Sequence, residues 1–160
     1  MNILDWLALV SAVGSALIAG SFFAFSTFVM RALGKLPAPQ GIAAMQSINI
    51  VVINPWFMTP FVGTAVLSAL VAGTSAVRWH EPGAGFVLAG ALLYVAGTFL
   101  VTVAFNVPRN NALAAVAPAS EEAATLWASY LSTWTAWNHV RTLAALGAMA
   151  CFTIALRLRG

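Results

Sequence analysis

The chain has 160 residues, of which 61% are hydrophobic and only 7% are charged. A soluble domain normally carries about 25% charged residues, so this composition excludes an ordinary water-soluble protein. The formal net charge is +3, but the basic residues are scattered and lie mostly beside apolar runs. We therefore expect them to set membrane topology and contact lipid headgroups, and we expect no nucleic-acid partner.

The first apolar run extends from about residue 6 to 30 without a charged side chain. About 20 apolar residues suffice to cross a bilayer. The run is too long for a signal-peptide core and no lysine or arginine precedes it, so we expect a retained transmembrane helix. Small residues recur at every fourth position, at Ala12, Ala16, Gly20 and Ala24. This stripe predicts close helix packing, either within one bundle or in a homo-oligomer.

Arg31 and Lys35, followed by two prolines, end this helix. A short helix is predicted over residues 41–53, with Gln46 and Asn49 on one side. A second apolar run covers about 55–77, residues 78–83 form a tight turn, and a third run covers about 84–107.

The second long connection contains an amphipathic helix that we expect to begin near Ser120, with Glu121 and Glu122 in its first turn. Aromatic residues recur on one face of it at helical spacing. A fourth span is predicted at about 140–157. The sequence thus predicts an all-α fold with one transmembrane domain over residues 1–160. This is a four-helix integral membrane bundle whose two long connections carry short amphipathic helices on one side.

Four spans put both termini and the 78–83 turn on one side of the membrane. That side carries Arg78, Arg157 and Arg159, and the other carries Arg31, Lys35, Arg109 and Arg141. The count alone does not decide the orientation. If the arginines of the second side belong to a site, the remaining charges favour cytoplasmic termini, and we expect a bacterial inner membrane.

Three groups of polar residues fall on the side of the long connections, where they are predicted to form one pocket at the mouth of the bundle. Polar groups at the end of a membrane segment are costly without a partner and therefore indicate function. Amides and guanidinium groups can bind an oxyanion, indoles can stack on a flat ring, and a neutral imidazole can accept a proton. The predicted catalytic residues are His139, Asn138 and Arg141, and the predicted substrate-binding residues are Gln46, Asn49, Asn106, Arg109, Asn110, Trp134 and Trp137.

A protein-bound metal needs three or four clustered ligands. The two histidines, His80 and His139, are expected at opposite membrane faces, and the four carboxylates do not cluster in the sequence. We therefore predict no metal site and no cofactor. His139 could equally be a structural histidine, and the aromatic residues could form an interfacial belt.

Four motifs resemble the anthrone oxygenase family of small four-helix membrane proteins. They are Gly-Ser-Phe-Phe-Ala-Phe-Ser at 20–26, Met-Gln-Ser-Ile-Asn at 45–49, Asn-Val-Pro-Arg-Asn at 106–110 and Trp-Thr-Ala-Trp-Asn-His-Val-Arg-Thr at 134–142. The resemblance implies oxidation of an anthrone to an anthraquinone by molecular oxygen without an evident cofactor. In that chemistry His139 would remove a ring-methylene proton, and Arg141, Asn138 or Asn106 would stabilise the enolate.

The resulting hypothesis is a membrane-embedded, cofactor-independent oxygenase. Its partners would be molecular oxygen and a flat phenolic or polyaromatic substrate. The alternative is a non-enzymatic module that binds a quinone, a lipid or a small aromatic compound, or a subunit of a larger membrane complex. A transporter is disfavoured because the spans are almost purely apolar below the mouth.

Overall fold

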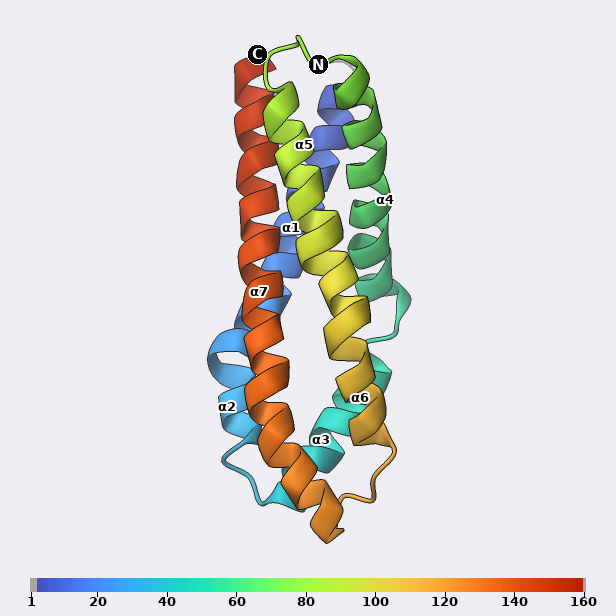
Figure 1. Cartoon of the computed structure of the whole chain (residues 1–160), viewed down its shortest axis with the longest axis vertical. Coiled ribbons are helices and arrows are strands. Elements are labelled where there is room, and N and C mark those ends of the chain that lie inside the picture. Colours follow the sequence, from blue (N-terminus) through green and yellow to red (C-terminus); the bar gives the residue numbers. More distant parts are fainter. Residues whose placement is uncertain (1–2, 160) are drawn as a thin grey trace.

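The computed structural model describes residues 3–159 and shows four long helices that run side by side (Figure 1). They are Ile3–Leu33, Pro55–Val77, Ala84–Ala114 and Glu121–Arg159, and each is long and apolar enough to cross a membrane. The protein is an integral membrane four-helix bundle. Both described ends and the turn between the second and third helices lie at one end of the bundle, and the connections lie at the other.

Two of the four helices change their winding along their length. The first consists of α1 (Ile3–Ala24), the π-helical segment η1 (Phe25–Val29) and α2 (Met30–Leu33). The third consists of α5 (Ala84–Leu92), the π-helical segments η2 (Leu93–Leu100) and η3 (Thr102–Asn106), and α6 (Val107–Ala114). Pro108 therefore does not end the third helix. The π-helical segment η3 ends just before Pro108 and lets the helix continue past the proline. π-helical turns are a common cause of a bend in a helix.

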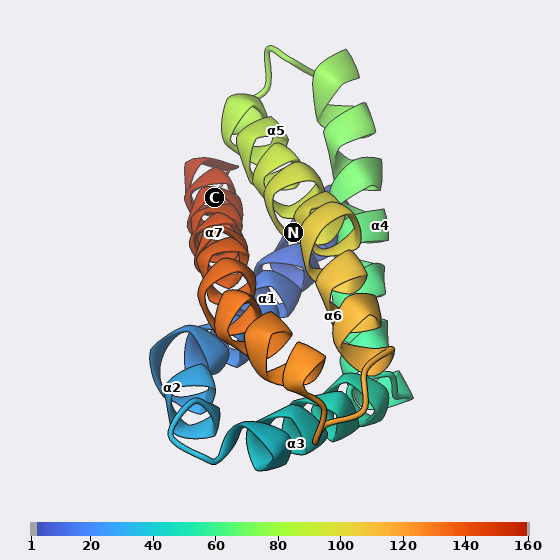
Figure 2. The ribbon, with the colours of Figure 1, turned by 60° about the horizontal axis from the view of Figure 1, so that its bottom comes forward.

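The remaining elements are α3 (Ala38–Val51), α4 (Pro55–Val77) and α7 (Glu121–Arg159). α4 begins where the Asn54 side chain accepts a hydrogen bond from the backbone N–H of Phe57 at 3.1 Å, a standard N-cap. α3 lies across the connection end of the bundle, beneath α2, α6 and α7 (Figure 2). It is the amphipathic helix predicted for the first connection.

α7 differs from the expected arrangement. The predicted amphipathic helix near Ser120 and the predicted fourth span at about 140–157 form one continuous helix of 39 residues. No glycine or proline occurs between Glu121 and Leu146, so nothing in the local sequence breaks the helix. The Ser120 hydroxyl accepts a hydrogen bond from the Ala123 N–H at its start.

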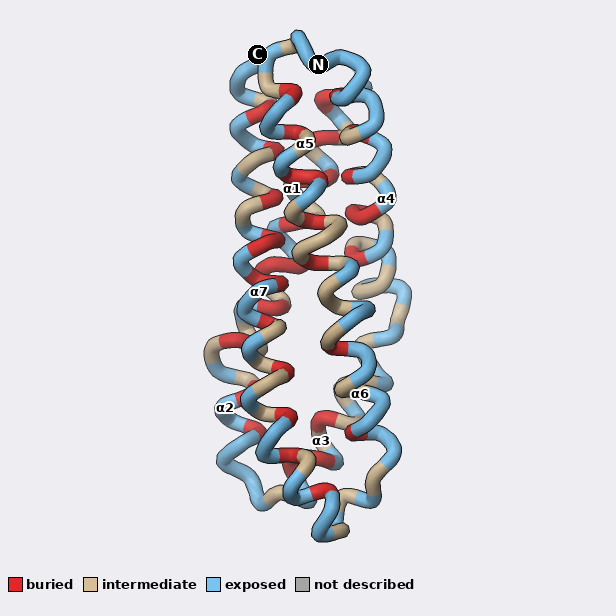
Figure 3. The backbone as a smooth tube through the Cα atoms, viewed as in Figure 1, coloured by how far each residue is buried: buried red, intermediate tan, exposed pale blue. Residues whose placement is uncertain are grey.

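Buried residues face the bundle axis along the whole length of the molecule (Figure 3). The predicted small-residue stripe does not follow this inner face, because Ala16 and Gly20 are exposed. The close approach lies elsewhere on the first helix: a Cβ atom at Gly14 would overlap the Thr64 side chain of α4. Packing inside the bundle thus uses Gly14 and leaves Ala16 and Gly20 on the outer surface.

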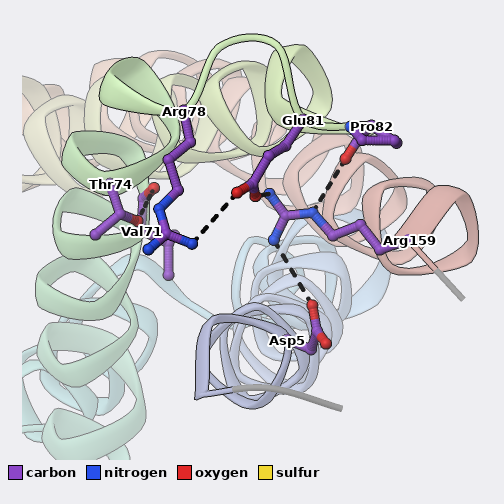
Figure 4. A network of polar contacts seen from close by, with 7 residues as sticks. All are labelled: Asp5, Val71, Thr74, Arg78, Glu81, Pro82 and Arg159. Carbon is purple, nitrogen blue, oxygen red and sulfur yellow. Dashed lines mark hydrogen bonds and ion pairs between the residues drawn. The ribbon is translucent and has the colours of Figure 1, made fainter.

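Ionic contacts hold the bundle together at the end that carries both described ends of the chain (Figure 4). The Arg159 guanidinium lies 3.7 Å from the Asp5 carboxylate and 4.0 Å from the Glu81 carboxylate, and its Nε donates to the carbonyl of Pro82. Glu81 also pairs with Arg78 at 3.3 Å.

The same turn contains Gly83, whose φ of +79° and close contact with Ala155 leave no room for a side chain.

Candidate functional site

A buried polar cluster centred on Arg141 occupies the middle of the bundle. The Arg141 side chain projects from α7, and the residue is only 3% exposed. One terminal nitrogen donates to Thr102 Oγ1 at 3.2 Å, and the other donates to Asn138 Oδ1. The guanidinium carbon lies 4.0 Å from the centre of the Phe22 ring and 5.0 Å from that of Trp134. The cation is thus fixed between two aromatic faces.

Asn138 connects this cation to the first helix. It is fully buried, and its Nδ2 donates to the Phe22 carbonyl and to Ser26 Oγ, each at 2.7 Å. Ser26 in turn lies 3.1 Å from the Thr142 hydroxyl. Since Asn138 Oδ1 accepts from Arg141, both ends of this amide are used, and its orientation is determined.

The side-chain partners of Arg141 and Asn138 on the other helices lie in π-helical segments. Ser26 is in η1, and Thr102 is in η3. Thr98 in η2 donates to the Arg141 carbonyl at 3.4 Å. π-helical turns are rare and occur frequently at functional sites. Three of them around one buried arginine mark this level of the bundle as specialised.

Arg141 has no acidic partner in the part of the chain that the structure describes. None of the ion pairs within residues 3–159 involves it, and its Nε is buried without a hydrogen-bond partner. A buried cation is costly when it is not paired. Two neighbouring amides also keep unused groups, Oδ1 of Asn106 and Nδ2 of Asn49. The cluster therefore combines an uncompensated positive charge with unused donor and acceptor groups.

Asn106 and Asn110 form the link between this cluster and a groove. Asn106 is 1% exposed and donates from Nδ2 to the Trp134 carbonyl at 3.3 Å. One turn further, Asn110 Oδ1 accepts from both the Tyr130 hydroxyl and Trp134 Nε1, each at 2.8 Å. The indole of Trp134 thus contacts Asn110 on one side and Arg141 on the other.

The groove lies between α3 and α6 and has a volume of about 610 Å³. This is within the range of small-molecule sites, about 300–1,000 Å³. Its polar lining consists of Gln46, Asn49, Asn110 and Asn111, and Ile50 and Ile53 belong to its apolar lining. Gln46 is occupied structurally, because its Nε2 donates to the Leu113 and Val116 carbonyls. A second groove of about 600 Å³ between α1 and α4 contains no predicted site residue in its lining.

Some predicted residues lie apart from this cluster. Arg109 donates to Thr133 Oγ1 of α7 and to the Phe105 carbonyl. The Trp137 ring stacks on Phe105 with centroids 3.6 Å apart and an interplanar angle of 6°. His139 is exposed and lines a different hollow, with Arg31 and Lys35. Its predicted role as a base stays a prediction, and its imidazole is not part of the Arg141 cluster.

The sequence reasoning missed Thr98 and Thr102. Together with Asn106 they recur at every fourth position of the third helix, a spacing that puts side chains on one face. A search of the apolar run for hydroxyl groups in step with Asn106 would have found both. Within residues 3–159, no group of three or more histidine, cysteine or acidic side chains is placed to hold a metal ion.

The chain matches a known protein family. The family model described as anthrone oxygenase matches residues 52–151. This range includes Asn106, Asn110 and the whole Trp134–Thr142 motif. No curated protein and no solved structure matches the chain.

Proposed function

Because the chain belongs to the anthrone oxygenase family, we propose that it is a membrane-embedded oxygenase that oxidises a flat phenolic or polyaromatic, anthrone-like substrate with molecular oxygen. The observation that carries this proposal is the buried Arg141, a fixed cation without an acidic partner among residues 3–159. Such a group suits a substrate that becomes an anion during the reaction, because a fixed charge in a buried site stabilises developing charge strongly.

The reaction needs no external reductant. An anthrone loses one methylene proton and becomes an enolate, whose oxygen faces Arg141. The enolate carbon gives its electrons to dioxygen and forms a carbon–oxygen bond, which yields a peroxide. The peroxide takes up a proton, the remaining hydrogen on that carbon leaves as a proton, and the oxygen–oxygen bond breaks. One oxygen atom stays as the new quinone carbonyl, and the other leaves as water.

Each residue of the cluster has a different role in the proposed reaction. Arg141 holds the enolate oxygen, Asn138 orients the guanidinium group, and the free Oδ1 of Asn106 accepts a hydrogen bond from a phenolic hydroxyl group of the substrate. The substrate enters by the groove between α3 and α6 and moves the Trp134 indole, which separates the groove residue Asn110 from Arg141. Water in the groove takes the methylene proton.

The test is oxygen uptake by the detergent-purified protein with dithranol, a dihydroxyanthrone, measured against the spontaneous rate. In ¹⁸O₂ we expect one labelled oxygen atom in each quinone formed. The variant Arg141→Met should lose this activity. Its matched control is Arg157→Met, which removes an exposed arginine from the other end of the same helix. Uptake no faster than the spontaneous rate, combined with saturable dithranol binding, would instead support a non-enzymatic module for aromatic ligands.

We further propose that the termini are cytoplasmic in a bacterial inner membrane. If Arg109 and Arg141 serve the site, three basic residues remain on the terminal side and two on the other. Fusion of a reporter that is active only in the periplasm to the C-terminus tests this proposal. An active fusion protein would show that the C-terminus is periplasmic and would contradict the proposed orientation.

A further inference from the structure

A second hollow lies between the end of the first long helix and the middle of α7. Its volume is about 490 Å³. The first helix contributes Ser26, Met30, Arg31, Gly34 and Lys35, and α7 contributes Leu131, Thr135 and His139. The α7 residues recur every fourth position on a stripe that does not include Arg141, and Ser26, which accepts a hydrogen bond from Asn138, lies where the hollow adjoins the Arg141 cluster. The hollow therefore adjoins the site proposed above at Ser26, whereas its charged residues, Arg31 and Lys35, are not part of that site.

The hollow is positively charged and has no acidic side chain in its lining. Arg31 and Lys35 are exposed, and neither takes part in an ion pair within residues 3–159. The acidic residues of α7, Glu121 and Glu122, lie at its start. Glu122 is nine residues before Leu131, about 13 Å along the helix axis. The two cations are therefore available for an anion from outside the chain.

One hydroxyl group in the hollow has no hydrogen-bond partner among the described residues. Thr135 Oγ1 is buried and makes no hydrogen bond within the described chain. A threonine in a helix usually donates to the carbonyl four residues earlier, as Thr153 does. Ser26 Oγ is already engaged with Asn138 and Thr142. Thr135 thus offers a free donor beside two cations, which matches an anionic oxygen.

The surroundings indicate that this anion is attached to an apolar molecule. Towards the middle of the bundle, the two flanking helices expose large apolar side chains. Phe23 of the first helix is 54% exposed, and Leu143 of α7 is 69% exposed. A headgroup in the hollow would leave its acyl chains along these residues. A free anion would gain nothing from them.

We propose that this hollow binds the phosphate group of an anionic phospholipid. Arg31 and Lys35 supply the charge, Thr135 donates a hydrogen bond, and the acyl chains lie against Phe23 and Leu143. Clusters of basic residues next to a membrane segment are a recognised means of binding anionic lipids. This inference is independent of the proposed oxygenase activity.

The experiment measures lipid binding by the detergent-purified full chain, using native mass spectrometry with three probes. These are dioleoylphosphatidylglycerol, dioleoylphosphatidylcholine and inorganic phosphate. We expect phosphatidylglycerol to bind at least tenfold more tightly than phosphatidylcholine, and millimolar phosphate not to displace it. Equal binding of the two lipids would overturn the proposal. Displacement by phosphate would assign the hollow to a free anion and would also overturn it.

Two double variants test whether phosphatidylglycerol binds in this hollow. The double variant Arg31→Gln, Lys35→Gln should weaken phosphatidylglycerol binding about 30-fold, since each basic residue near an anionic surface contributes about a factor of five. The matched control, Arg78→Gln with Arg157→Gln, makes the same change in net charge at the opposite end. An equal loss in both double variants would show non-specific attraction and refute the site.

Thr135→Val provides a test that does not alter charge. It should weaken phosphatidylglycerol binding about 10-fold to 100-fold, because one hydrogen bond to a charged group is lost. Thr153→Val is its control, since that hydroxyl is exposed and bonded within its own helix. This pair keeps the proposal testable if the double variant fails to fold. Unchanged binding in Thr135→Val would remove that residue from the site and contradict the proposal.

Discussion

Replacing Arg141 by methionine separates the functional role of this residue from a structural one. Methionine fills much of the same apolar space and removes the charge. In the proposed reaction the lost cation stabilises the enolate, and removal of one such group from a preorganised site typically costs about 100-fold to 1,000-fold in rate. We expect kcat/KM for dithranol oxidation to fall by that factor.

The same change should have little effect on stability. The guanidinium group makes two hydrogen bonds and two aromatic contacts, but its burial costs several kcal/mol because no acid compensates it. Methionine removes this cost and leaves Asn138 Oδ1 without its donor, a penalty of about 1–3 kcal/mol. These terms oppose each other, so the free energy of unfolding should change by no more than about 2 kcal/mol.

The assay combines oxygen uptake with thermal unfolding in the same detergent. Arg141→Lys keeps the charge but cannot reach Asn138 and Thr102 in the same forked geometry, so we expect an intermediate loss of about tenfold. Arg157→Met should behave as wild type in both measurements. A folded Arg141→Met protein with activity within tenfold of wild type would refute the reasoning, as would a variant that unfolds while its residual folded fraction remains fully active.

Four further predictions follow from the described contacts. Asn138→Ala should lower the free energy of unfolding by about 2–4 kcal/mol, because three buried polar groups each lose a hydrogen bond to this amide; an unchanged thermal midpoint would contradict this. Trp134→Phe keeps an aromatic ring but loses the hydrogen bond to Asn110 that holds the gate closed, so steady-state kinetics should show KM lowered about fivefold with kcat nearly constant, and a raised KM or a fall in kcat alone would count against a gating role. His139→Ala should reduce turnover by less than tenfold if the imidazole does not act as the base, since it lines another hollow; a loss of 100-fold or more would support its predicted role as the base. Arg159→Gln should lower the unfolding free energy by roughly 1 kcal/mol through the lost ionic contacts, and a thermal midpoint no lower than that of the exposed control Arg157→Gln would show that these contacts contribute nothing.

The architecture was accessible from the sequence because apolar length is a strong signal in a membrane protein. The second helix has the predicted bounds, 55–77. The third persists through Pro108, which brings Asn106 and Asn110 onto one face as expected. The continuity of α7 was missed, although the absence of glycine and proline from Glu121 to Leu146 already indicated it.

The sequence pointed to most of the residues of the candidate site, but only partly to which of them lie together. Asn106, Asn138, Arg141 and Trp134 do come together, because helical spacing determines which side chains share a face. His139 and Arg141 are two residues apart and therefore face different directions. The π-helical segments were beyond prediction, since a change of winding depends on packing between helices. They set the final positions of Ser26, Thr98 and Thr102.

The unbroken length of α7 places the Arg141 cluster at a definite depth. Its 39 residues measure about 58 Å, roughly twice the thickness of a hydrocarbon core. If Arg157 marks one boundary of that core, Arg141 lies about 24 Å away, just inside the opposite boundary. Dioxygen dissolves better in hydrocarbon than in water, and a flat, largely apolar aromatic molecule also gains from leaving water. A reaction at this level would draw both reactants from the lipid phase, and its rate would follow their partition coefficients rather than their aqueous concentrations.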